Sequence, residues 1–425
     1  MLLLSDAASA PAVLPAPDRV CGGESPRTCI RTLDTTTSLV LRWAVRRRAP
    51  RPFLIVAAAI VLLLALVRLR FGGGERLEDR TTDPELPPSA LEEVVSLGHP
   101  PGNIAVSPDG RIFFTLHPDG DPPTAVHELR DGKPVPYPDA SFQPGGDAEL
   151  AFTTPLAVRV DRQNRLWVLD HAGFAREQPR LVAFDLATGE VVHRHDFPSD
   201  VAGLLSMVND FQVDPAGETI YIAEASPILQ TPALLVHDVA SNTTRRVLDG
   251  HDSVEARDFL LQAPGRDMQL FGLYSLRIPV DSIALDREGE WLYYGPLTGD
   301  RLFRVRTRDL RDASLSPEDL AARVEDYGPK TISDGITTDV EGNVYLSDPE
   351  HSAVLTLGPD RKLVTLVKDE RLRWPDGFSF GPDGWLYVTA SSLQHVLFMS
   401  EAHRDAHAPY HIFRFKPGPA GVPGH

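Results

Sequence analysis

A short sequence phrase occurs six times in this chain of 425 residues and restricts its fold more than any other feature. The clearest copy is SDGITTDVEGNVYLSD at Ser333–Asp348, in which an Asp-Gly pair precedes a short strand, a turn and a second strand. The turn residues of the copies are Gly110, Asn164, Gly217, Gly289, Gly342 and Gly384, and the residues eight places earlier form a column of Gly102, Leu156, Asn209, Asp281, Asp334 and Asp376. Such recurrence predicts a repeat architecture in which equivalent residues occupy equivalent places.

The spacing of the copies predicts an all-β protein, a six-bladed β-propeller with four strands per blade. Successive turn residues are 54, 53, 72, 53 and 42 positions apart, and about 40 to 50 residues is the usual length of a blade. A parallel β-helix would need much shorter repeats. The surplus of the third unit, near Phe259–Arg277, is predicted to be a long loop over one face.

The two ends of the repeat region predict how the ring closes. The sixth unit ends with YHIFRFKP (Tyr410–Pro417) as a third strand and lacks a fourth, while LEEVVSLG (Leu91–Gly98) is a strand without a blade of its own. Pairing these two strands would close the ring and cover two exposed edges. The propeller is therefore expected at residues 91–417, followed by a disordered tail at 418–425.

The segment before the repeats predicts attachment to a membrane. Residues 1–41 are predicted to be disordered, and residues 42–71 a basic flank followed by a transmembrane signal anchor whose core is the uncharged run Phe53–Val67. More arginines precede this run than follow it, which favours a single-pass protein of the cytoplasmic membrane with the propeller on the extracytoplasmic side. A secreted product after cleavage and a buried helix are the alternatives. Residues 72–90 are predicted to be a flexible linker.

Composition excludes some classes of function. The net charge is −17, and residues 1–76 contain 11 Lys and Arg against 5 Asp and Glu, so the rest of the chain is strongly acidic. An acidic body repels phosphate backbones, so no nucleic-acid partner is expected. The only cysteines, Cys21 and Cys29, precede the repeats, which therefore cannot use disulfides or thiolate ligands.

Several phrases together resemble one known family. RVDRQNRLWVLD, DGITTDVEGNVYLSD and LRWPDGFSFGPDGWLYVT are similar to the major royal jelly protein and yellow family, in its bacterial branch. The resemblance implies a six-bladed propeller, usually secreted, with small molecules bound in the central cavity of some members, and dopachrome conversion is attributed to some insect relatives. The dipeptide Asp170-His171 departs from the family pattern, where a small residue is expected after the aspartate.

The column that opens each inner strand supplies the candidate site. Asn209, Asp281, Asp334 and Asp376 are predicted to surround one mouth of the channel, where converging carboxylates need a cation, raised pKa values or hydrogen bonds. A calcium site is one interpretation, and a likeness to regucalcin and gluconolactonase propellers implies a divalent metal at this strand position. The alternative is that each aspartate only caps a tight turn.

Other polar residues are weaker candidates. Asn103, Asp210 and His171 are predicted to contact a ligand as well. The histidines His403, His407 and His411 recur every fourth residue, as metal ligands on a helix do, but Pro409 interrupts them and favours a solvated loop. Trp374 is expected either in the core or as a stacking platform.

Two functions follow from these predictions. The first is a membrane-tethered binding protein that holds a small, cationic or aromatic ligand in its channel, with calcium as the one cofactor that the column suggests. The alternative is an enzyme using the same cavity, either a metal-dependent lactonase-like hydrolase or a dopachrome-type isomerase. A scaffold for protein interactions comes third. A propeller by itself does not specify a reaction, so the sequence leaves open whether the protein is an enzyme.

Overall fold

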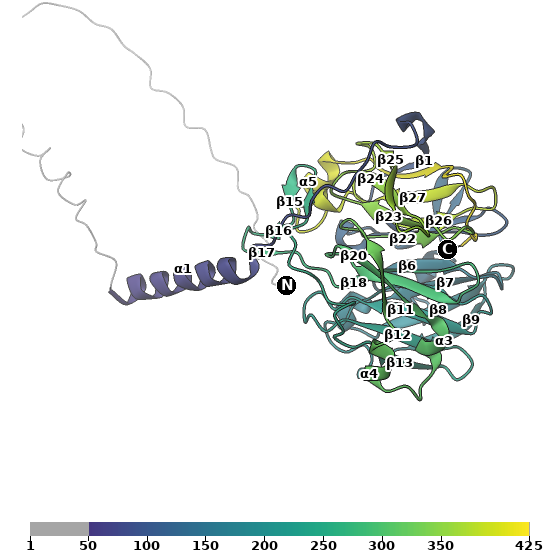
Figure 1. The fold of residues 1–425 in the computed structure, drawn as a ribbon, viewed down its shortest axis with the longest axis horizontal. Coiled ribbons are helices and arrows are strands. Elements are labelled where there is room, and N and C mark those ends of the chain that lie inside the picture. Colours follow the sequence, from purple (N-terminus) through teal and green to yellow (C-terminus); the bar gives the residue numbers. More distant parts are fainter. Residues whose placement is uncertain (1–50, 425) are drawn as a thin grey trace, which may run out of the picture. The chain divides into compact units, whose positions relative to one another are not determined.

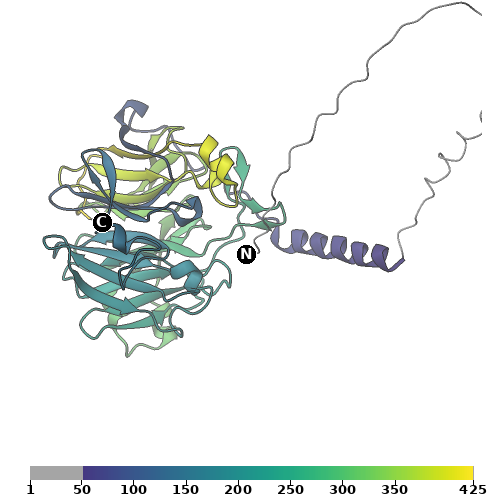
Figure 2. The ribbon, with the colours of Figure 1, turned by 180° about the vertical axis from the view of Figure 1, so that it is seen from behind.

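The computed structural model describes residues 51–424 and contains six four-stranded antiparallel sheets (Figures 1 and 2). Blade 1 consists of β2 (Pro101–Val106), β3 (Ile112–Leu116), β4 (Val126–Arg130) and β5 (Lys133–Pro136). Blade 2 consists of β6 (Pro155–Val160), β7 (Arg165–Asp170), β8 (Arg180–Asp185) and β9 (Val191–Asp196). Blade 3 consists of β10 (Val208–Val213), β11 (Thr219–Glu224), β12 (Ala233–Asp238) and β13 (Thr243–Val247).

The later blades repeat this meander. Blade 4 consists of β18 (Val280–Leu285), β19 (Trp291–Pro296), β20 (Arg301–Arg306) and β21 (Glu325–Pro329). Blade 5 consists of β22 (Ile336–Thr338), β23 (Val344–Asp348), β24 (Ala353–Leu357) and β25 (Leu363–Lys368). Blade 6 consists of β26 (Pro375–Phe380), β27 (Leu386–Ala390), β28 (Tyr410–Phe415) and, from the other end of the domain, β1 (Glu92–Leu97). The predicted all-β, six-bladed architecture is thus confirmed.

The inner strands contact one another in cyclic order, because β2 meets β6 on one side and β26 on the other. Strand β1 pairs antiparallel with β28, with Leu97 opposite Tyr410 and Val95 opposite Ile412. This is the pairing that the unpaired strands of the sequence predicted. Hydrophobic side chains of neighbouring blades fill the space between the sheets, and the largest cluster joins blade 6, blade 1 and the insertion after blade 3.

Turn chemistry explains why each unit starts as a hairpin. All six predicted turn residues have a positive φ, between 62° for Asn164 and 88° for Gly110, a backbone conformation that glycine and asparagine adopt most readily. Four of these turns are capped by an aspartate three places earlier, and its carboxylate accepts hydrogen bonds from backbone N–H groups of the turn. These aspartates are Asp161, Asp214, Asp286 and Asp339.

The surplus of the third unit is more ordered than a loop. It forms two small hairpins, β14 (Gln262–Ala263) with β15 (Arg266–Asp267), and β16 (Gln269–Leu270) with β17 (Tyr274–Ser275). Short helices occupy other connections: α2 (Ala172–Ala175), α3 (Thr307–Arg311), α4 (Pro317–Ala321) and α5 (Glu401–Ala406), with the 3-10 turns η1 (Pro88–Ala90), η2 (Pro118–Gly120), η3 (Ala140–Phe142) and η4 (Leu393–His395).

The two segments beside the propeller differ from the prediction. The segment 72–90, expected to be a flexible linker, is hydrogen-bonded to the blades. The backbone N–H of Leu86 donates to the carbonyl of Leu366, and the side chain of Arg80 donates to the carbonyl of Lys330. The expected disordered tail also binds, because the N–H of Gly424 donates to the carbonyl of Phe380, near β26 in Figure 1. Both segments are held by backbone groups that the inner and outer strands leave unpaired.

The predicted transmembrane anchor is not supported. Helix α1 (Arg51–Phe71) covers the described part of this segment, but no helix within residues 51–424 is long and apolar enough to cross a membrane. The predicted tail at 1–41, the basic residues before 51 and both cysteines lie outside the described residues. An extracytoplasmic location therefore stays a prediction.

Candidate functional site

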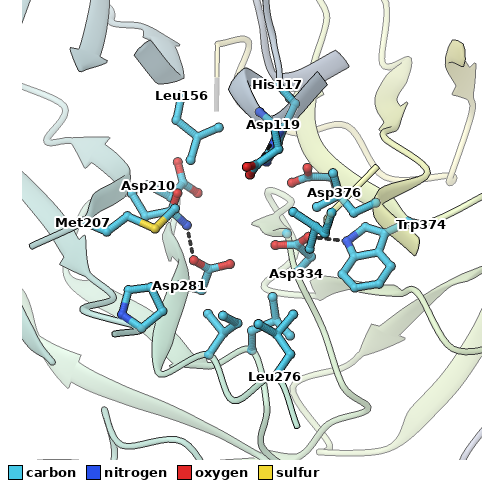
Figure 3. Close-up of a pocket in the computed structure, with 18 of the residues that line it drawn as sticks. His117, Asp119, Leu156, Met207, Asp210, Leu276, Asp281, Asp334, Trp374 and Asp376 are labelled. Carbon is cyan, nitrogen blue, oxygen red and sulfur yellow. Dashed lines mark hydrogen bonds and ion pairs between the residues drawn. The ribbon is translucent and has the colours of Figure 1, made fainter. Parts of the chain in front are cut away.

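The propeller encloses a cavity of about 580 Å³ at one end of its channel (Figure 3). In an antiparallel meander the first strand of each blade starts at the same face, and the loops from second to third strands lie at that face too. The cavity therefore collects the first residues of the inner strands and several long loops. Its polar floor comes from the strands, and its apolar wall comes from the loops.

Every member of the predicted column lines this cavity. Gly102 and Leu156 do so together with the polar members Asn209, Asp281, Asp334 and Asp376, and the neighbours Asn103 and Asp210 line it as well. In Figure 3 the carboxyl groups of Asp210, Asp281, Asp334 and Asp376 point into the same space, and that of Asp119 in η2 lies there as well. The sequence column and its neighbours therefore identify the polar floor of the cavity.

Two of these carboxylates accept hydrogen bonds from side chains in neighbouring blades. The Asn209 amide donates to Asp281, and Trp374 Nε1 donates to Asp334 Oδ2 at 2.5 Å. The turn-capping alternative applies to a different column, five places further along each repeat, where Asp161 and its equivalents accept from the backbone. Trp374, with 1% of its surface exposed, packs in the core as one of its two expected roles requires, and its indole N–H also holds a cavity carboxylate, while the role of a stacking platform stays a prediction.

Crowding of carboxylates sets the electrostatics of the floor. Burial, followed by repulsion from Asp334 and hydrogen bonding to it, raises the pKa of Asp281 well above its usual range. Burial and repulsion from Asp334 and Asp210 likewise raise the pKa of Asp376. Within residues 51–424, neither these two groups nor Asp334 forms an ion pair with a lysine or arginine. The floor therefore attracts protons or other cations.

Asp210 is the exception, because it has a buried arginine as its partner. Arg159 Nη2 lies 2.8 Å from Asp210 Oδ1 and 2.9 Å from Oδ2, and both side chains are almost fully buried. Asn103 bridges the pair, since its Oδ1 accepts from Arg159 and its amide lies 3.4 Å from Asp210. Burial raises the pKa of Asp210, and the charge of Arg159 opposes that rise. This group neutralises one of the carboxylates and fixes the position of blade 2 against blade 3.

Sequence reasoning missed Arg159, although a signal was present. It lies three places after the column residue of its repeat, where the other repeats have the small or uncharged residues Ala105, Gln212, Ala284, Thr337 and Ser379. All of these positions are buried. A single arginine in a buried column indicates a partner of opposite charge, because an unpaired buried charge is costly.

The apolar wall was also missed. It includes Met268, Leu270 and Leu276 from the insertion after blade 3, Ile228 from the β11–β12 loop, and Leu393, Leu397 and Phe398 from the β27–β28 loop. No repeat contains these residues, so the column analysis could not find them. Their hydrophobicity in segments of irregular structure is the one signal that the sequence offers.

His171, another residue predicted to contact a ligand, does not line this cavity. Its side chain is 3% exposed, its Nδ1 accepts from the N–H of Phe174 at 3.0 Å, and its ring packs edge-on against Phe174. Burial lowers the pKa of His171 to about 4, so the ring is neutral at pH 7. The histidine that faces the cavity is His117, at the start of η2. His171 instead begins the turn that places Phe174 at the cavity, and a direct contact of His171 with a ligand stays an untested prediction.

A calcium site does not follow directly from the donors present. The four predicted ligands supply three carboxylates and one amide oxygen, which is the chemistry that calcium prefers. Among the described residues, however, the carboxylates of Asp281, Asp334 and Asp376 do not form a group whose ligand atoms all lie within 4.8 Å of one another. Calcium binding at this column stays a prediction.

The raised pKa of Asp376 predicts how stability depends on pH. Between the ordinary aspartate pKa, about 3.9, and the raised value, the folded protein holds a proton that the unfolded chain has released. Stability therefore falls as pH rises through this window, and the loss persists above it. We expect Asp376→Asn to raise the free energy of unfolding by about 1 kcal/mol at pH 8 and to change little near pH 4, since both side chains are then neutral.

Urea unfolding at several pH values measures this effect. The control is Asp383→Asn, which removes the same charge from an exposed turn of the same blade. An Asp376→Asn variant that is less stable than the wild type at pH 8 would mean that the ionised carboxylate is satisfied by its neighbours.

Comparisons with known proteins agree with this fold. The family model "Major royal jelly protein" matches residues 153–404. Major royal jelly protein 1 of Apis mellifera is 24% identical over 230 residues, covering 49% of this chain and 51% of that protein. Protein yellow of Drosophila pseudoobscura pseudoobscura is 28% identical over 229 residues, covering 48% of this chain and 39% of that protein. This chain thus spans about half the length of the royal jelly protein and less of the yellow protein.

A solved structure supports the architecture at lower sequence similarity. A luciferin-regenerating enzyme superposes with a TM-score of 0.50 at 14% identity, covering 79% of this chain and 97% of that protein. This likeness concerns the fold alone. The family model, in contrast, matches more than half of the chain, including five of the six repeat copies, from the second onward, and most of the residues that line the cavity. This chain therefore belongs to the major royal jelly protein family, as the resemblance in its repeats predicted.

Proposed function

We propose that the cavity binds a small organic cation, an amine whose ammonium group lies among Asp281, Asp334 and Asp376. Its apolar or aromatic part would contact the wall of Met268, Leu276 and neighbouring side chains. The observation that carries the proposal is the set of three carboxylates which face one cavity and have no lysine or arginine partner within the described chain. A ligand with a positive end and an apolar body matches both surfaces.

Electrostatics explains why such a ligand would bind. The carboxylates repel one another, and burial together with this repulsion raises the pKa values of Asp281 and Asp376, so the charged floor of the free protein is costly at neutral pH. An ammonium about 4 Å from one carboxylate gains roughly 4 kcal/mol of Coulomb energy at an effective dielectric constant of about 20, before it loses its hydration. Burial of the apolar part adds about 25 cal/mol per Å². The net affinity is smaller than these terms, because binding orders the ligand.

The enzyme hypotheses have less support. A metal-dependent hydrolase would require the carboxylates to gather around one ion, and among the described residues the ligand atoms of Asp281, Asp334 and Asp376 do not all lie within 4.8 Å of one another. A dopachrome-type isomerase would need a proton acceptor placed against a bound substrate. His117 and the aspartates could exchange protons there, but no observation selects that reaction. The binding function is therefore the one that the geometry favours.

Isothermal titration with a matched pair of probes tests the proposal. Phenethylamine is cationic at pH 7, and 2-phenylethanol is a neutral molecule of similar size and shape. We expect the amine to bind at least tenfold more tightly than the alcohol, and Asp334→Asn to remove most of that difference. Asparagine at 334 can still accept the hydrogen bond from Trp374 Nε1, so the fold should persist. The amine should bind less tightly as the pH falls through the raised pKa values of Asp281 and Asp376, because their carboxylates become neutral.

Two controls separate this proposal from its rivals. Asp383→Asn, in an exposed turn, should leave the affinity for the amine unchanged. Titration with calcium alone provides the second control. If calcium raises the melting temperature, Asp334→Asn abolishes that rise, and the amine and the alcohol bind equally, the site holds a metal and the amine proposal is wrong.

A further inference from the structure

Three histidines come together in the β27–β28 loop, outside the polar floor of the cavity. His395 ends η4, His403 lies on α5, and His407 follows the last turn of that helix. The rings of His395 and His407 stack with centroids 3.8 Å apart, and those of His403 and His407 with centroids 4.2 Å apart. One ring nitrogen from each residue lies within 4.8 Å of the other two. Within residues 51–424 this is the one group of three or more His, Cys, Asp or Glu side chains with that spacing.

The sequence prediction for this segment was partly wrong. It expected His403, His407 and His411 to share a spacing of four residues but to lie in a solvated loop. The helix α5 does form, since Ser400 caps it by accepting from the N–H of His403. Strand β28 begins at Tyr410, so His411 belongs to that strand and lies outside the cluster. Its Nε2 is 3.7 Å from a carboxylate oxygen of Glu93 on β1, the strand that pairs with β28. His395, eight residues before His403, takes the third place.

Hydrogen bonding leaves suitable nitrogens free in two of the rings. His407 Nδ1 lies 2.8 Å from the backbone carbonyl of His403. A carbonyl only accepts, so Nδ1 carries the hydrogen and the lone pair is on Nε2, which is how metal-binding histidines are commonly oriented. His403 Nε2 is buried and has no hydrogen-bond partner. A buried ring nitrogen without a partner is costly, and a bound metal would satisfy it.

The charge state and surroundings favour one class of metal. All three side chains of the cluster are imidazoles, so the cluster itself supplies no anionic oxygen ligand. The guanidinium groups of Arg266 and Arg373 bind backbone carbonyls beside the cluster and oppose a cation. Calcium and magnesium bind mainly through charge and oxygen ligands, whereas zinc, copper and nickel form strong bonds to imidazole.

We propose that His395, His403 and His407 form a binding site for a transition metal of the zinc class, with a fourth position open to water. Nitrogen ligands of tetrahedral zinc are about 3.3 Å apart, given zinc–nitrogen bonds of about 2.0–2.1 Å. The ring nitrogens here, which lie within 4.8 Å of one another, have to approach more closely, and rotation of these partly exposed side chains allows that. The metal would join η4 to α5 across the connecting residues 396–400.

The site is linked to the cavity through its own loop. Leu393, Leu397 and Phe398 line the cavity and flank His395, and Arg266, which also lines the cavity, donates to the carbonyl of Gln394 at 2.7 Å. In Figure 1, α5 lies beside β15. A metal would therefore hold in place the part of the apolar wall that blade 6 contributes. The proposal does not depend on the identity of the cavity ligand, because none of the three histidines lines the floor.

Titration of the metal-free protein with zinc tests the site, with cobalt as a spectroscopic probe. We expect one zinc ion per chain, a rise in melting temperature with zinc that calcium does not reproduce, and visible cobalt bands typical of four-coordinate geometry. His403→Gln and His395→Gln should each weaken zinc binding at least tenfold and remove the rise. Circular dichroism verifies that both variants fold, and His403 lies on a short surface helix whose loss of a ring should not unfold the propeller.

His411→Gln is the matched control, because it removes a nearby histidine of the original spacing that lies outside the cluster. It should bind zinc as the wild type does. Equal loss of zinc binding in the His411→Gln variant, or unchanged stoichiometry and affinity in both His403→Gln and His395→Gln, would overturn the proposal. A zinc affinity that Asp334→Asn reduces and His403→Gln does not would place the metal in the cavity floor instead.

Discussion

Removal of strand β1 (Glu92–Leu97) is expected to destabilise the propeller by about 5 kcal/mol or more, enough to leave much of the protein unfolded at 37 °C. Val95 and Leu97 are 7% and 5% exposed and belong to the largest hydrophobic cluster, so the deletion exposes their partners to water. It also leaves the edge of β28 without its hydrogen-bonded neighbour. Urea unfolding followed by circular dichroism measures the loss.

Two point substitutions in β1 test whether the loss of stability comes from its buried side chains. Leu97→Ala should cost about 2–5 kcal/mol, since it removes a buried side chain and leaves a cavity. Ser96→Ala, on the exposed face of the same strand, should lie within about 0.5 kcal/mol of the wild type. If the deletion variant melts within a degree or two of the parent, β1 does not hold the ring closed.

Arg159→Met is expected to cost about 3–5 kcal/mol of folding free energy, because it leaves Asp210 buried without its cation. The loss should be smaller in acid, since burial already raises the pKa of Asp210 and its protonated form needs no partner. Arg159 bonds to Asn103 as well as to Asp210, so contacts between three blades are lost together. Chemical unfolding at pH 5 and pH 8 measures both effects.

A double-mutant cycle isolates the interaction between the two charges. The variant with both Arg159→Met and Asp210→Leu should regain most of the stability that Arg159→Met loses, because no buried charge remains. Arg162→Met, an exposed arginine of the same hairpin, is the control and should change stability by less than about 0.5 kcal/mol. Additive effects of the two substitutions would show that Arg159 and Asp210 do not stabilise each other.

In this site, stability of the free protein and affinity for a cationic ligand place opposite demands on the carboxylates. Carboxylates that repel one another reduce the stability of the free protein, and the same repulsion supplies attraction for a cationic ligand. We therefore expect substitutions in the floor, such as Asp376→Asn, to stabilise the free protein and weaken amine binding together. The ion pair of Arg159 and Asp210 limits this repulsion by neutralising one carboxylate.

The repeats by themselves determined the fold class and the polar floor of the cavity. The turns need a residue with a positive φ, and glycine or asparagine at positions such as Gly110 and Asn164 identifies them in the sequence. The column eight places earlier shares one position in every blade, so Asn209, Asp281, Asp334 and Asp376 had to converge if the blades form a ring. The unpaired strands at Leu91–Gly98 and Tyr410–Pro417 likewise predicted their own pairing.

The tertiary structure alone decided which side chains meet across irregular segments. The pair of Arg159 and Asp210 joins two blades, and the residues that surround the cavity above the floor come from loops outside the repeat. His171 turned inward because its ring caps a local turn, and His395 joined His403 and His407 because the loop folds back on itself. Because the blades repeat, a residue at one position of a repeat predicts where the equivalent residues of the other blades lie. The conformation of a loop depends instead on contacts that occur only once in the molecule, and no sequence period predicts those contacts.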